Sequence, residues 1–330
     1  MCGMTTKPRG LGERSLLSMA PPERGRKCSS LLSFAAKIAC VDFPWIRLVL
    51  LWVLVIICSL VHQFAPLKDS YLNNTDNVLN AYFAEWSWAW TVIPTAIFVL
   101  LSSYVYTVGS VRAVLKHQVR MVVGTVVWRV WVGLFLGVRQ WTVSCSDRSF
   151  GANSTACEEA GHRWEGYDIS GHTFLLSFCI FFITSELSVL LRWDSIPERL
   201  EKLGTVRLRD EQPSDRSDEG AEDETHTVEE SDSSLEWFYR LTPFLWPLFC
   251  LLVLLRLLWG FLLTVTALYF HTVGEKLIGL FCGTFSWWMT YEVWYKRAFP
   301  GRPGGGPLGL DGTHTHGTPQ PGQIELPATN

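Results

Sequence analysis

Two histidines lie where long apolar segments begin or end, and both could do acid-base or nucleophilic chemistry. His172 follows Ser170 and Gly171 at the entry to one apolar segment. His271 ends another apolar segment and precedes Glu275 by four residues. An imidazole can attack phosphorus or protonate a leaving oxygen near neutral pH. If both rings meet at one place, the pair is suited to chemistry on phosphate or diphosphate groups.

The residues before His172 are typical of a helix start that binds an anion. Asp168 and Ser170 are both good N-cap residues, so either could accept a hydrogen bond from the first amides of the helix. Those amides and the positive end of the helix dipole attract phosphate, and Gly171 removes a side chain that would block close approach. The same dipole disfavours the protonated ring of His172, so a bound anion is needed before that ring can act as an acid.

The surroundings of His271 favour the same chemistry. Glu275 could orient the imidazole if the turn between them is helical, and Gly274 leaves that open. Lys276 adds a positive charge beside them. A single histidine at a membrane surface is more often just an amphipathic residue that reaches water. Two histidines on one face make phosphoryl or diphosphate chemistry the better interpretation.

The composition indicates that membrane-spanning helices hold these histidines. Hydrophobic residues make up 48 % of the 330 residues, and there are sixteen tryptophans, which is unusual for a soluble chain. A net charge of −3 argues against a nucleic-acid partner, which would require a basic surface. We expect an all-α polytopic membrane protein, because six apolar segments approach the roughly 20 residues that cross a bilayer: Leu48–Phe64, Trp88–Thr107, Met121–Val138, Ile169–Leu191, Phe244–Phe270 and Leu277–Tyr295.

The distribution of lysine and arginine predicts how these helices are oriented, because basic residues accumulate on the cytosolic side. Such residues are concentrated before the first segment, between the second and third, and after the fourth. The N- and C-termini are then cytosolic, and loops 65–87, 139–168 and 271–276 face the lumen or the exterior. Both histidines fall on that non-cytosolic side.

Two further features agree with this orientation. Asn73 and Asn153 each begin an N-glycosylation sequon, and both lie in loops expected on the non-cytosolic side. Cys145 and Cys157 are the only cysteines in loop 139–168. We expect them to form a disulfide, since that side of a secretory-pathway membrane is oxidising.

We expect three regions along the chain. Residues 1–44 form a cytosolic N-terminal tail, and residues 45–296 form the six-helix transmembrane domain. Within this domain, residues 193–240 form an acidic, disordered cytosolic loop. Residues 297–330, rich in Gly and Pro, form a disordered cytosolic C-terminal tail.

The acidic loop and the C-terminal tail are not expected to carry chemistry. From Asp210 to Glu236 there are twelve acidic residues and one base, so the loop is interpreted as a solvated linker, with a phosphorylated regulatory segment as the alternative. His314 and His316 lie in the tail, where nothing rigid would supply further metal ligands. No metal and no cofactor is expected.

Four charged residues lie inside the predicted spans, namely Arg129, Glu186, Arg256 and Glu292. They could pair across helices, as Arg129 with Glu186 or Arg256 with Glu292, or the two acids could reach cytosolic water. Charges inside a membrane usually have a function, which leaves a transporter or ion pathway open. No inverted repeat or broken pair of helices is visible in the sequence.

Two GxxxG spacings occur within the spans, at Gly133–Gly137 and at Gly279–Gly283. This spacing lets helix backbones approach closely. We interpret both as packing motifs.

Several motifs in this chain resemble the fat storage-inducing transmembrane (FIT) family. The two histidine motifs are the most specific: Trp164-Glu165-Gly166-Tyr167-Asp168-Ile169-Ser170-Gly171-His172-Thr173-Phe174-Leu175-Leu176, and Tyr269-Phe270-His271 with Lys276. Supporting matches are Ser70-Tyr71-Leu72, Asn77-Val78-Leu79-Asn80, Trp88-Ala89-Trp90, Cys145, Cys157 and Trp294-Tyr295. The resemblance covers most of the chain, although the tails and the acidic loop show no match.

This resemblance implies a six-span protein of the endoplasmic reticulum with a lipid-phosphatase-like bundle, needed for lipid droplet formation. It implies lumenal cleavage of the diphosphate of fatty acyl-CoA, giving acyl 4′-phosphopantetheine and adenosine 3′,5′-bisphosphate. His271 would be the nucleophile and His172 the general acid, without a metal. The expected substrate-binding residues are Asp168, Ser170, Gly171, Glu275 and Lys276.

The phosphate-binding pattern of the wider lipid phosphatases is missing from this chain. Neither their Lys-x6-Arg-Pro motif nor their Ser-Arg pair ahead of the nucleophile occurs, and Val265 stands where the arginine of that pair would be. Lys276, Arg139 and Arg163 are candidates for the phosphate-binding cation by location alone.

The leading hypothesis is therefore a lumenal acyl-CoA diphosphatase whose partners are fatty acyl-CoA, diacylglycerol, triacylglycerol and membrane lipids. The alternative is a non-enzymatic protein that binds diacylglycerol or triacylglycerol and partitions neutral lipid into droplets. That alternative needs neither His172 nor His271, so substitution of the two residues distinguishes the hypotheses.

Overall fold

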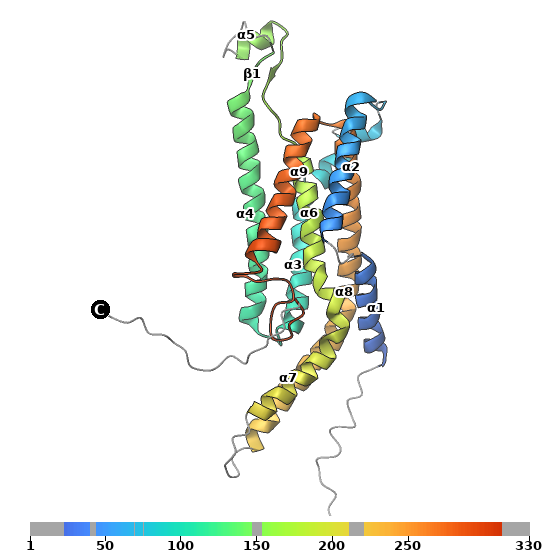
Figure 1. Cartoon of the computed structure of the whole chain (residues 1–330), viewed down its shortest axis with the longest axis vertical. Coiled ribbons are helices and arrows are strands. Elements are labelled where there is room, and N and C mark those ends of the chain that lie inside the picture. The colour runs from blue at the N-terminus through green and yellow to red at the C-terminus, as the bar shows by residue number, and fades with distance from the viewer. Residues whose placement is uncertain are drawn as a thin grey trace, which may run out of the picture.

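The computed structural model of the chain is a bundle of long helices that run side by side (Figure 1). It describes residues 23–39, 44–68, 70–74, 76–146, 154–210 and 221–311. For residues 23–26, 44, 204–210 and 221–232 only the backbone is described.

Within these residues, five helices are long and apolar enough to cross a membrane. They are α2 (Pro44–Phe64), α3 (Ser87–Tyr106), α4 (Val111–Thr142), α6 (Gly171–Leu187) with its continuation through η5 (Ser188–Ser195) into α7 (Ile196–Asp210), and α8 (Ala221–Tyr269). The all-α class is confirmed, and the first five predicted spans correspond to helices that are long and apolar enough to cross a membrane.

The sixth predicted span is shorter and less regular. Helix α9 (Val273–Trp287) passes directly into a wider π-helical segment, η6 (Trp288–Trp294). The α-helical part has 15 residues, fewer than the roughly 20 that a span requires. The number of spans shown by helix length and composition is therefore five.

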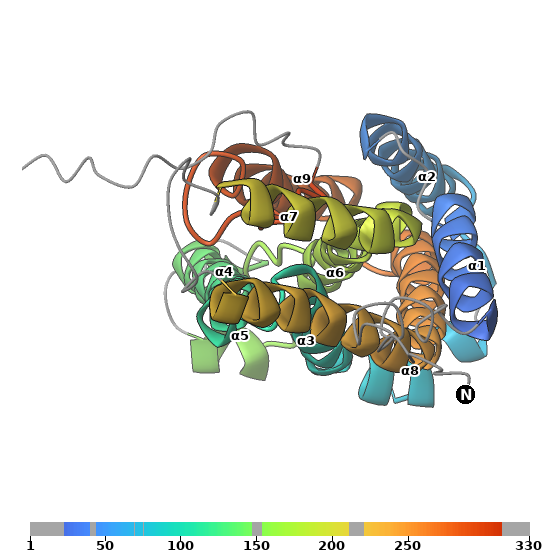
Figure 2. The ribbon, with the colours of Figure 1, turned by 90° about the horizontal axis from the view of Figure 1, so that it is seen from below.

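Helix α6 lies at the centre of the bundle, surrounded by the other long helices (Figure 2). In its most apolar stretch 78 % of the residues are buried, against 17 % in α2 and in α4. Phe174, Phe178 and Phe182 recur every four residues along α6, and Trp88 of α3 stacks on Phe178 with ring centroids 5.6 Å apart. Because neighbours cover α6 on every side, its apolar residues show almost no one-sided periodicity.

The connections between α2 and α3, α4 and α6, and α8 and α9 all lie at one end of the bundle, uppermost in Figure 1. We call this the loop end (the described residues of 65–86, 143–170 and 270–272). Residues 69, 75 and 147–153, including the predicted sequon residue Asn153, lie outside the described residues. It carries the short helices η2 (Tyr71–Asn73), η3 (Leu79–Ala84) and α5 (Ser154–Glu159), together with the antiparallel strands β1 (Ser144–Cys145) and β2 (Trp164–Glu165).

The opposite end, which we call the tail end, carries α1 (Glu23–Ala39), α7 and residues 295–311. The Ser33 hydroxyl of α1 donates to the Leu190 carbonyl of η5 over 2.9 Å, so part of the N-terminal tail packs on the bundle. Both flanks of the acidic loop are helical, as parts of α7 and α8, and residues 211–220 lie outside the described residues.

Residues 297–311 differ from the disordered tail that their composition predicts. They form turns that pack on the bundle and bury Leu308 and Leu310. Arg199 donates to the Leu308 carbonyl over 2.7 Å, and a ring nitrogen of His117 lies 3.0 Å from the Gly305 carbonyl. Side chains from other helices satisfy the backbone here, and local composition does not reveal them. Residues 312–330, including His314 and His316, lie outside the described residues.

The charged residues inside the helices do not form either of the predicted pairs. Glu186 accepts two hydrogen bonds from Arg120 (2.7 and 2.9 Å), and both side chains are fully buried. Arg129 instead lies on an exposed face of α4, beside the Trp128 ring. Nine residues at about 100° each place Arg120 and Arg129 on opposite faces of α4, which is why the pairing with Arg129 is wrong.

Glu292 does not pair with Arg256 either. Its carboxylate binds Lys296, four residues further along the chain, in the turn that follows η6. This pairing lies at the tail end, where both side chains are partly exposed.

Candidate active site

His271 lies in a short elbow between α8 and α9. Its backbone φ of 60° is in the left-handed region, which costs a non-glycine residue about 1–2 kcal/mol. Thr272 then caps α9: its N–H donates to the Glu275 carboxylate (2.8 Å), and its hydroxyl accepts from the Glu275 N–H (3.4 Å). This capping box fixes the direction of α9 and so holds His271 in its strained conformation.

The segment that enters α6 is tied to the same capping box. The Ser170 N–H donates to the Glu275 carbonyl over 3.3 Å, and the Asp168 N–H donates to the Glu275 carboxylate over 3.4 Å. Ser170 is the N-cap of α6, and its hydroxyl accepts from the Thr173 N–H at 3.3 Å. Glu275 therefore joins the two segments that carry the histidines.

Two glycines of α9 permit this close approach. A Cβ atom at Gly279 would lie 2.5 Å from the Ser170 carbonyl oxygen, and one at Gly283 would overlap the Ser177 hydroxyl. The second GxxxG spacing is therefore a packing motif, as expected. The first GxxxG spacing does not mediate packing between the described residues, because Cβ atoms at Gly133 and Gly137 would meet nothing within 4 Å.

The imidazole of His271 faces two carboxylates. Its Nδ1 lies 3.7 Å from an oxygen of Glu275 and 4.0 Å from an oxygen of Asp168. These distances are longer than hydrogen bonds, but they are short enough for strong attraction once the ring is charged. Carboxylates beside Nδ1 favour the tautomer with its proton there, which leaves the Nε2 lone pair for attack on an electrophile.

His172 is the second residue of α6 and is half-buried. It interacts electrostatically with His271 and with Glu85, which directly follows η3. The structure thus places two imidazoles that are far apart in the sequence within electrostatic range of each other. Glu85 was not singled out from the sequence, because no local pattern relates it to α6.

The side chain of Lys276 is bonded to the end of α8. Its side chain is fully buried, and its ammonium donates to the Ala267 carbonyl over 2.8 Å. Ala267 lies in the last turn of α8, where carbonyls have no partner within the helix. Lys276 therefore caps the end of α8.

Arg139 lies closer to the candidate site. Its guanidinium is 3.9 Å from an Asp168 oxygen and is largely exposed. The backbone of α4 and the entry to α6 are held side by side here, because Tyr167 N–H donates to the Thr142 hydroxyl over 2.7 Å. A Cβ atom at Gly166 would overlap the Arg139 carbonyl, so this contact requires glycine. Arg163, by contrast, is exposed and lies beside Glu165 in the hairpin.

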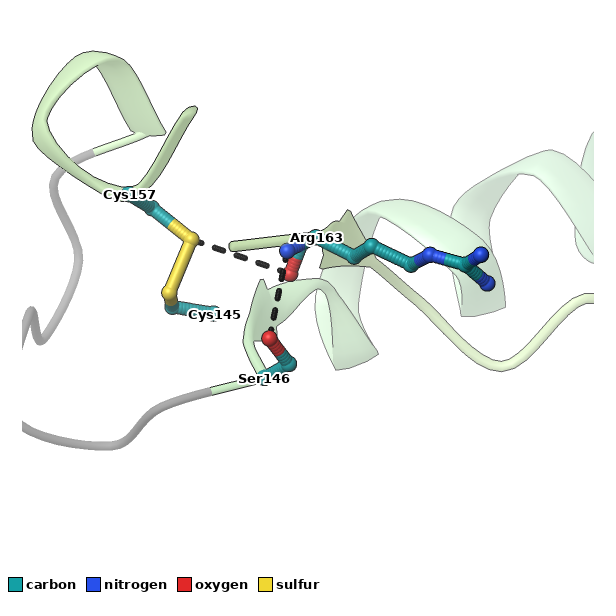
Figure 3. The surroundings of a disulfide bond; sticks show 4 residues. All are labelled: Cys145, Ser146, Cys157 and Arg163. Atoms are coloured by element: carbon teal, nitrogen blue, oxygen red, sulfur yellow. Dashed lines mark hydrogen bonds between the residues drawn. A yellow bond between two sulfur atoms is a disulfide. The ribbon is translucent and has the colours of Figure 1, made fainter. Parts of the chain in front are cut away.

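A disulfide-closed hairpin leads into this segment (Figure 3). Strands β1 and β2 pair in the register Cys145 with Trp164, and Cys145 is bonded to Cys157, which confirms the predicted disulfide. The Arg163 N–H donates to the Ser146 hydroxyl over 3.1 Å. The cross-link therefore restrains the strand that directly precedes Gly166 and Asp168.

Tyr167 is a further site residue that the sequence analysis did not single out. Its hydroxyl would lie 3.1 Å from a Cβ atom at Gly274, so the phenol covers the start of α9. Partial burial, and secondarily the charge of Glu275, raises the pKa of Tyr167 above its usual value of 10.0. The phenol remains a neutral hydrogen-bond donor at physiological pH.

This arrangement fits nucleophilic and acid-base chemistry on an anion. The first amides of α6, at Gly171 and His172, point out of the helix start, and a Cβ atom at Gly171 would meet nothing within 4 Å. That space is open to a ligand beside both imidazoles. Among the residues that the structure describes, no group of three His, Cys, Asp or Glu side chains is placed to hold a metal ion.

Comparison with known proteins relates the chain to one membrane-protein family. The family model described as fat storage-inducing transmembrane protein matches residues 138–291, which include both histidines. No solved structure matches the chain.

Curated relatives from several animals carry the name acyl-coenzyme A diphosphatase FITM2. The Drosophila melanogaster protein is 33 % identical over 254 residues, which are 76 % of this chain and 58 % of that protein. The Homo sapiens protein is 32 % identical, over 74 % of this chain and 81 % of its own length. The Danio rerio protein is 28 % identical, over 74 % and 82 %. The chain accordingly belongs to the fat storage-inducing transmembrane (FIT) family.

Proposed function

We propose that this chain is an acyl-CoA diphosphatase of the endoplasmic reticulum membrane. Relatives with about a third of their residues identical are named acyl-coenzyme A diphosphatase. The single observation that carries the proposal is the approach of His172 and His271 beside a capped helix start and two carboxylates. That combination supplies a nucleophile, an acid and an anion-binding surface in one place.

In the proposed reaction, Nε2 of His271 attacks one phosphorus of the acyl-CoA diphosphate. The bond from that phosphorus to the bridging oxygen breaks, and His172 protonates the departing phosphate. Water then cleaves the phosphorus–nitrogen bond and regenerates His271. The products are acyl 4′-phosphopantetheine and adenosine 3′,5′-bisphosphate.

Each charged neighbour has a distinct role in this proposal. Asp168 and Glu275 stabilise the positive charge that develops on His271 as it attacks. The amides of Gly171 and His172 receive the diphosphate oxygens, with Ser170 fixing the helix start. Arg139 is the cation that neutralises the diphosphate, which replaces Asp168 as the partner of the Arg139 guanidinium. Lys276 stabilises the fold and does not touch substrate.

The proposed topology has six spans, with α9 and η6 crossing as the sixth. Both termini are cytosolic, and the loop end with its disulfide faces the lumen, as do the two sequons that begin at Asn73 and Asn153. The acyl chain of the substrate remains among the helices, while its diphosphate reaches the loop end. Cleavage there supports lipid droplet formation, with diacylglycerol and triacylglycerol as further lipid partners.

The activity is tested with purified protein in liposomes and oleoyl-CoA as substrate, and mass spectrometry identifies both products. His172→Ala and His271→Ala should abolish product formation. His62→Gln is the matched control, because His62 also lies near the loop end but bonds the Leu268 carbonyl (2.8 Å). If both alanine variants form product at the wild-type rate, the enzyme proposal fails and the non-enzymatic lipid-binding alternative is favoured.

The orientation is tested separately in microsomes. A lumenal loop end predicts that glycosidase treatment reduces the apparent mass of the wild-type chain, and that Asn73→Gln removes one glycan. Resistance of the intact chain to glycosidase, combined with protease access to the loop end from the cytosolic side, would contradict the proposed topology.

A further inference from the structure

A groove on the outside of the bundle runs between α2, α6 and α8. It has a volume of about 420 Å³ and is lined mainly by apolar side chains. Leu50 of α2 and Leu257 of α8 are both largely exposed at its walls, so the groove opens towards the surrounding bilayer. Its shape and composition suit a hydrocarbon chain.

Two arginines stand in this otherwise apolar groove. Arg47 enters from the start of α2, and Arg256 comes from the middle of the apolar run of α8. No acidic side chain lines the groove. No hydrogen bond or ion pair joins Arg256 to any other described residue. A guanidinium inside a membrane segment is costly unless an anion compensates it.

A smaller cavity of about 260 Å³, lined by both charged and apolar side chains, adjoins the groove at the tail end. The two share Arg47 and Phe181 as lining residues, and Arg192 and Arg302 add two more guanidinium groups. Two acids, Glu292 and Asp311, also line this cavity. The Glu292 carboxylate already binds Lys296, so arginine charge predominates in the cavity.

We propose that the groove and the cavity together bind one acidic phospholipid of the leaflet at the tail end. Its phosphate is held between Arg47 and Arg256 where the two spaces meet, and one acyl chain lies in the groove against Leu50 and Leu257. Arginine suits this role because its planar donors match phosphate oxygens bidentately. The smaller cavity lies at the tail end and the groove runs from there along the outside of the bundle, and neither space is lined by His172 or His271. The proposed site does not depend on the proposed activity.

The dimensions favour a small phosphate headgroup over a nucleotide. A cavity of about 260 Å³ is below the roughly 300–1,000 Å³ of pockets that enclose drug-sized ligands. Adenosine and two further phosphates would not fit in it beside the arginine side chains. We therefore commit to a phosphate-bearing membrane lipid, with dioleoyl phosphatidic acid as the probe.

The binding test uses the full chain in detergent, with native mass spectrometry to count bound lipid and a titration to measure Kd. Wild type should bind one phosphatidic acid in preference to phosphatidylcholine. Arg256→Gln should weaken that binding about tenfold or more, the loss expected for a charge-assisted hydrogen bond. Arg129→Gln is the matched control, because Arg129 is another intramembrane arginine but lies on an exposed face of α4.

A second variant keeps the test valid if Arg256→Gln fails to fold. Gly260 lines the groove, and a Cβ atom there would meet nothing within 4 Å. Gly260→Leu therefore fills the groove without a clash and improves helix propensity, so it should lower phosphatidic acid binding while the protein stays folded.

Three outcomes overturn the proposal. The first is equal binding of phosphatidic acid by wild type, Arg256→Gln and Gly260→Leu, and the second is binding of phosphatidic acid with no preference over phosphatidylcholine. The third is complete displacement of phosphatidic acid by equimolar oleoyl-CoA or oleate, which would assign the site to a different amphiphile. Because the readout is binding, a failed diphosphatase assay leaves this result interpretable.

Discussion

Glu275 has two functions that a single substitution can separate. Its carboxylate completes the capping box of α9, and the same carboxylate lies beside the His271 imidazole. Glutamine also serves at this position of a capping box, so Glu275→Gln keeps the bond from the Thr272 N–H and removes the charge. It gives up only the long bond (3.4 Å) that the other carboxylate oxygen accepts from the Asp168 N–H. The variant therefore tests the electrostatic role of Glu275 while the fold is preserved.

The magnitude follows from the distance and the burial. The carboxylate oxygen is 3.7 Å from His271 Nδ1, and the two side chains are 14 % and 20 % exposed. At about 4 Å the attraction is roughly 1 kcal/mol in water and roughly 4 kcal/mol at the effective dielectric near a protein surface. At 1.4 kcal/mol per tenfold change in rate, loss of this attraction to the charged ring should lower kcat about five- to a thousandfold.

The assay compares the kcat of wild type, Glu275→Gln and Glu275→Ala for oleoyl-CoA, together with thermal melting in detergent. Glu275→Gln should melt like wild type, whereas Glu275→Ala should also lose about 1 kcal/mol of stability with the cap. The reasoning is refuted if Glu275→Gln retains a kcat within twofold of wild type, or if it melts as early as Glu275→Ala.

Three further substitutions test other parts of the structure. Gly171→Leu should abolish activity with unchanged melting, because the new side chain fills the space beside the start of α6, where no other atom lies within 4 Å. If the Gly171→Leu variant has wild-type kinetics, the diphosphate binds elsewhere. Arg139→Gln should raise KM for oleoyl-CoA at least tenfold and Arg139→Lys less, and equal KM values would exclude Arg139 as the phosphate-binding cation. Arg120→Ala should lower the free energy of unfolding by about 3–5 kcal/mol because it leaves the buried Glu186 carboxylate uncompensated. Arg120→Met combined with Glu186→Gln should lower the free energy of unfolding by less. A double variant that melts at a lower temperature than Arg120→Ala would contradict the ion-pair argument.

The sequence predicts the parts of the fold that local patterns determine. Apolar runs of sufficient length locate α2, α3, α4, α6 and α8, because length and hydropathy decide whether a helix enters a membrane. The cysteine pair is predictable because its loop contains no other cysteine. That His172 and His271 share one end follows from counting spans between them.

Side-chain partners depend on how each helix is rotated, and the sequence analysis did not resolve this. Glu186 pairs with Arg120 instead of Arg129 because those arginines face opposite sides of α4. Lys276 was expected beside the phosphate, yet its ammonium reaches the Ala267 carbonyl. The Thr-x-x-Glu spacing at Thr272 was a readable capping signal and would have placed Glu275.

The composition of residues 297–311 does not predict that this segment packs on the bundle. Gly and Pro usually indicate a disordered tail, but here the carbonyls of this segment accept hydrogen bonds from side chains on α4 and α7. Those donors lie about a hundred residues or more away in the chain. Only the packed bundle reveals them.

A double-mutant cycle on the two histidines tests the central claim most directly. Release of adenosine 3′,5′-bisphosphate from oleoyl-CoA is measured for wild type, His172→Gln, His271→Gln and the double variant. Residues that act as a unit lose nearly as much rate singly as together. We predict that each single variant is almost as inactive as the double variant, whereas a wild-type rate in either single variant would contradict the account.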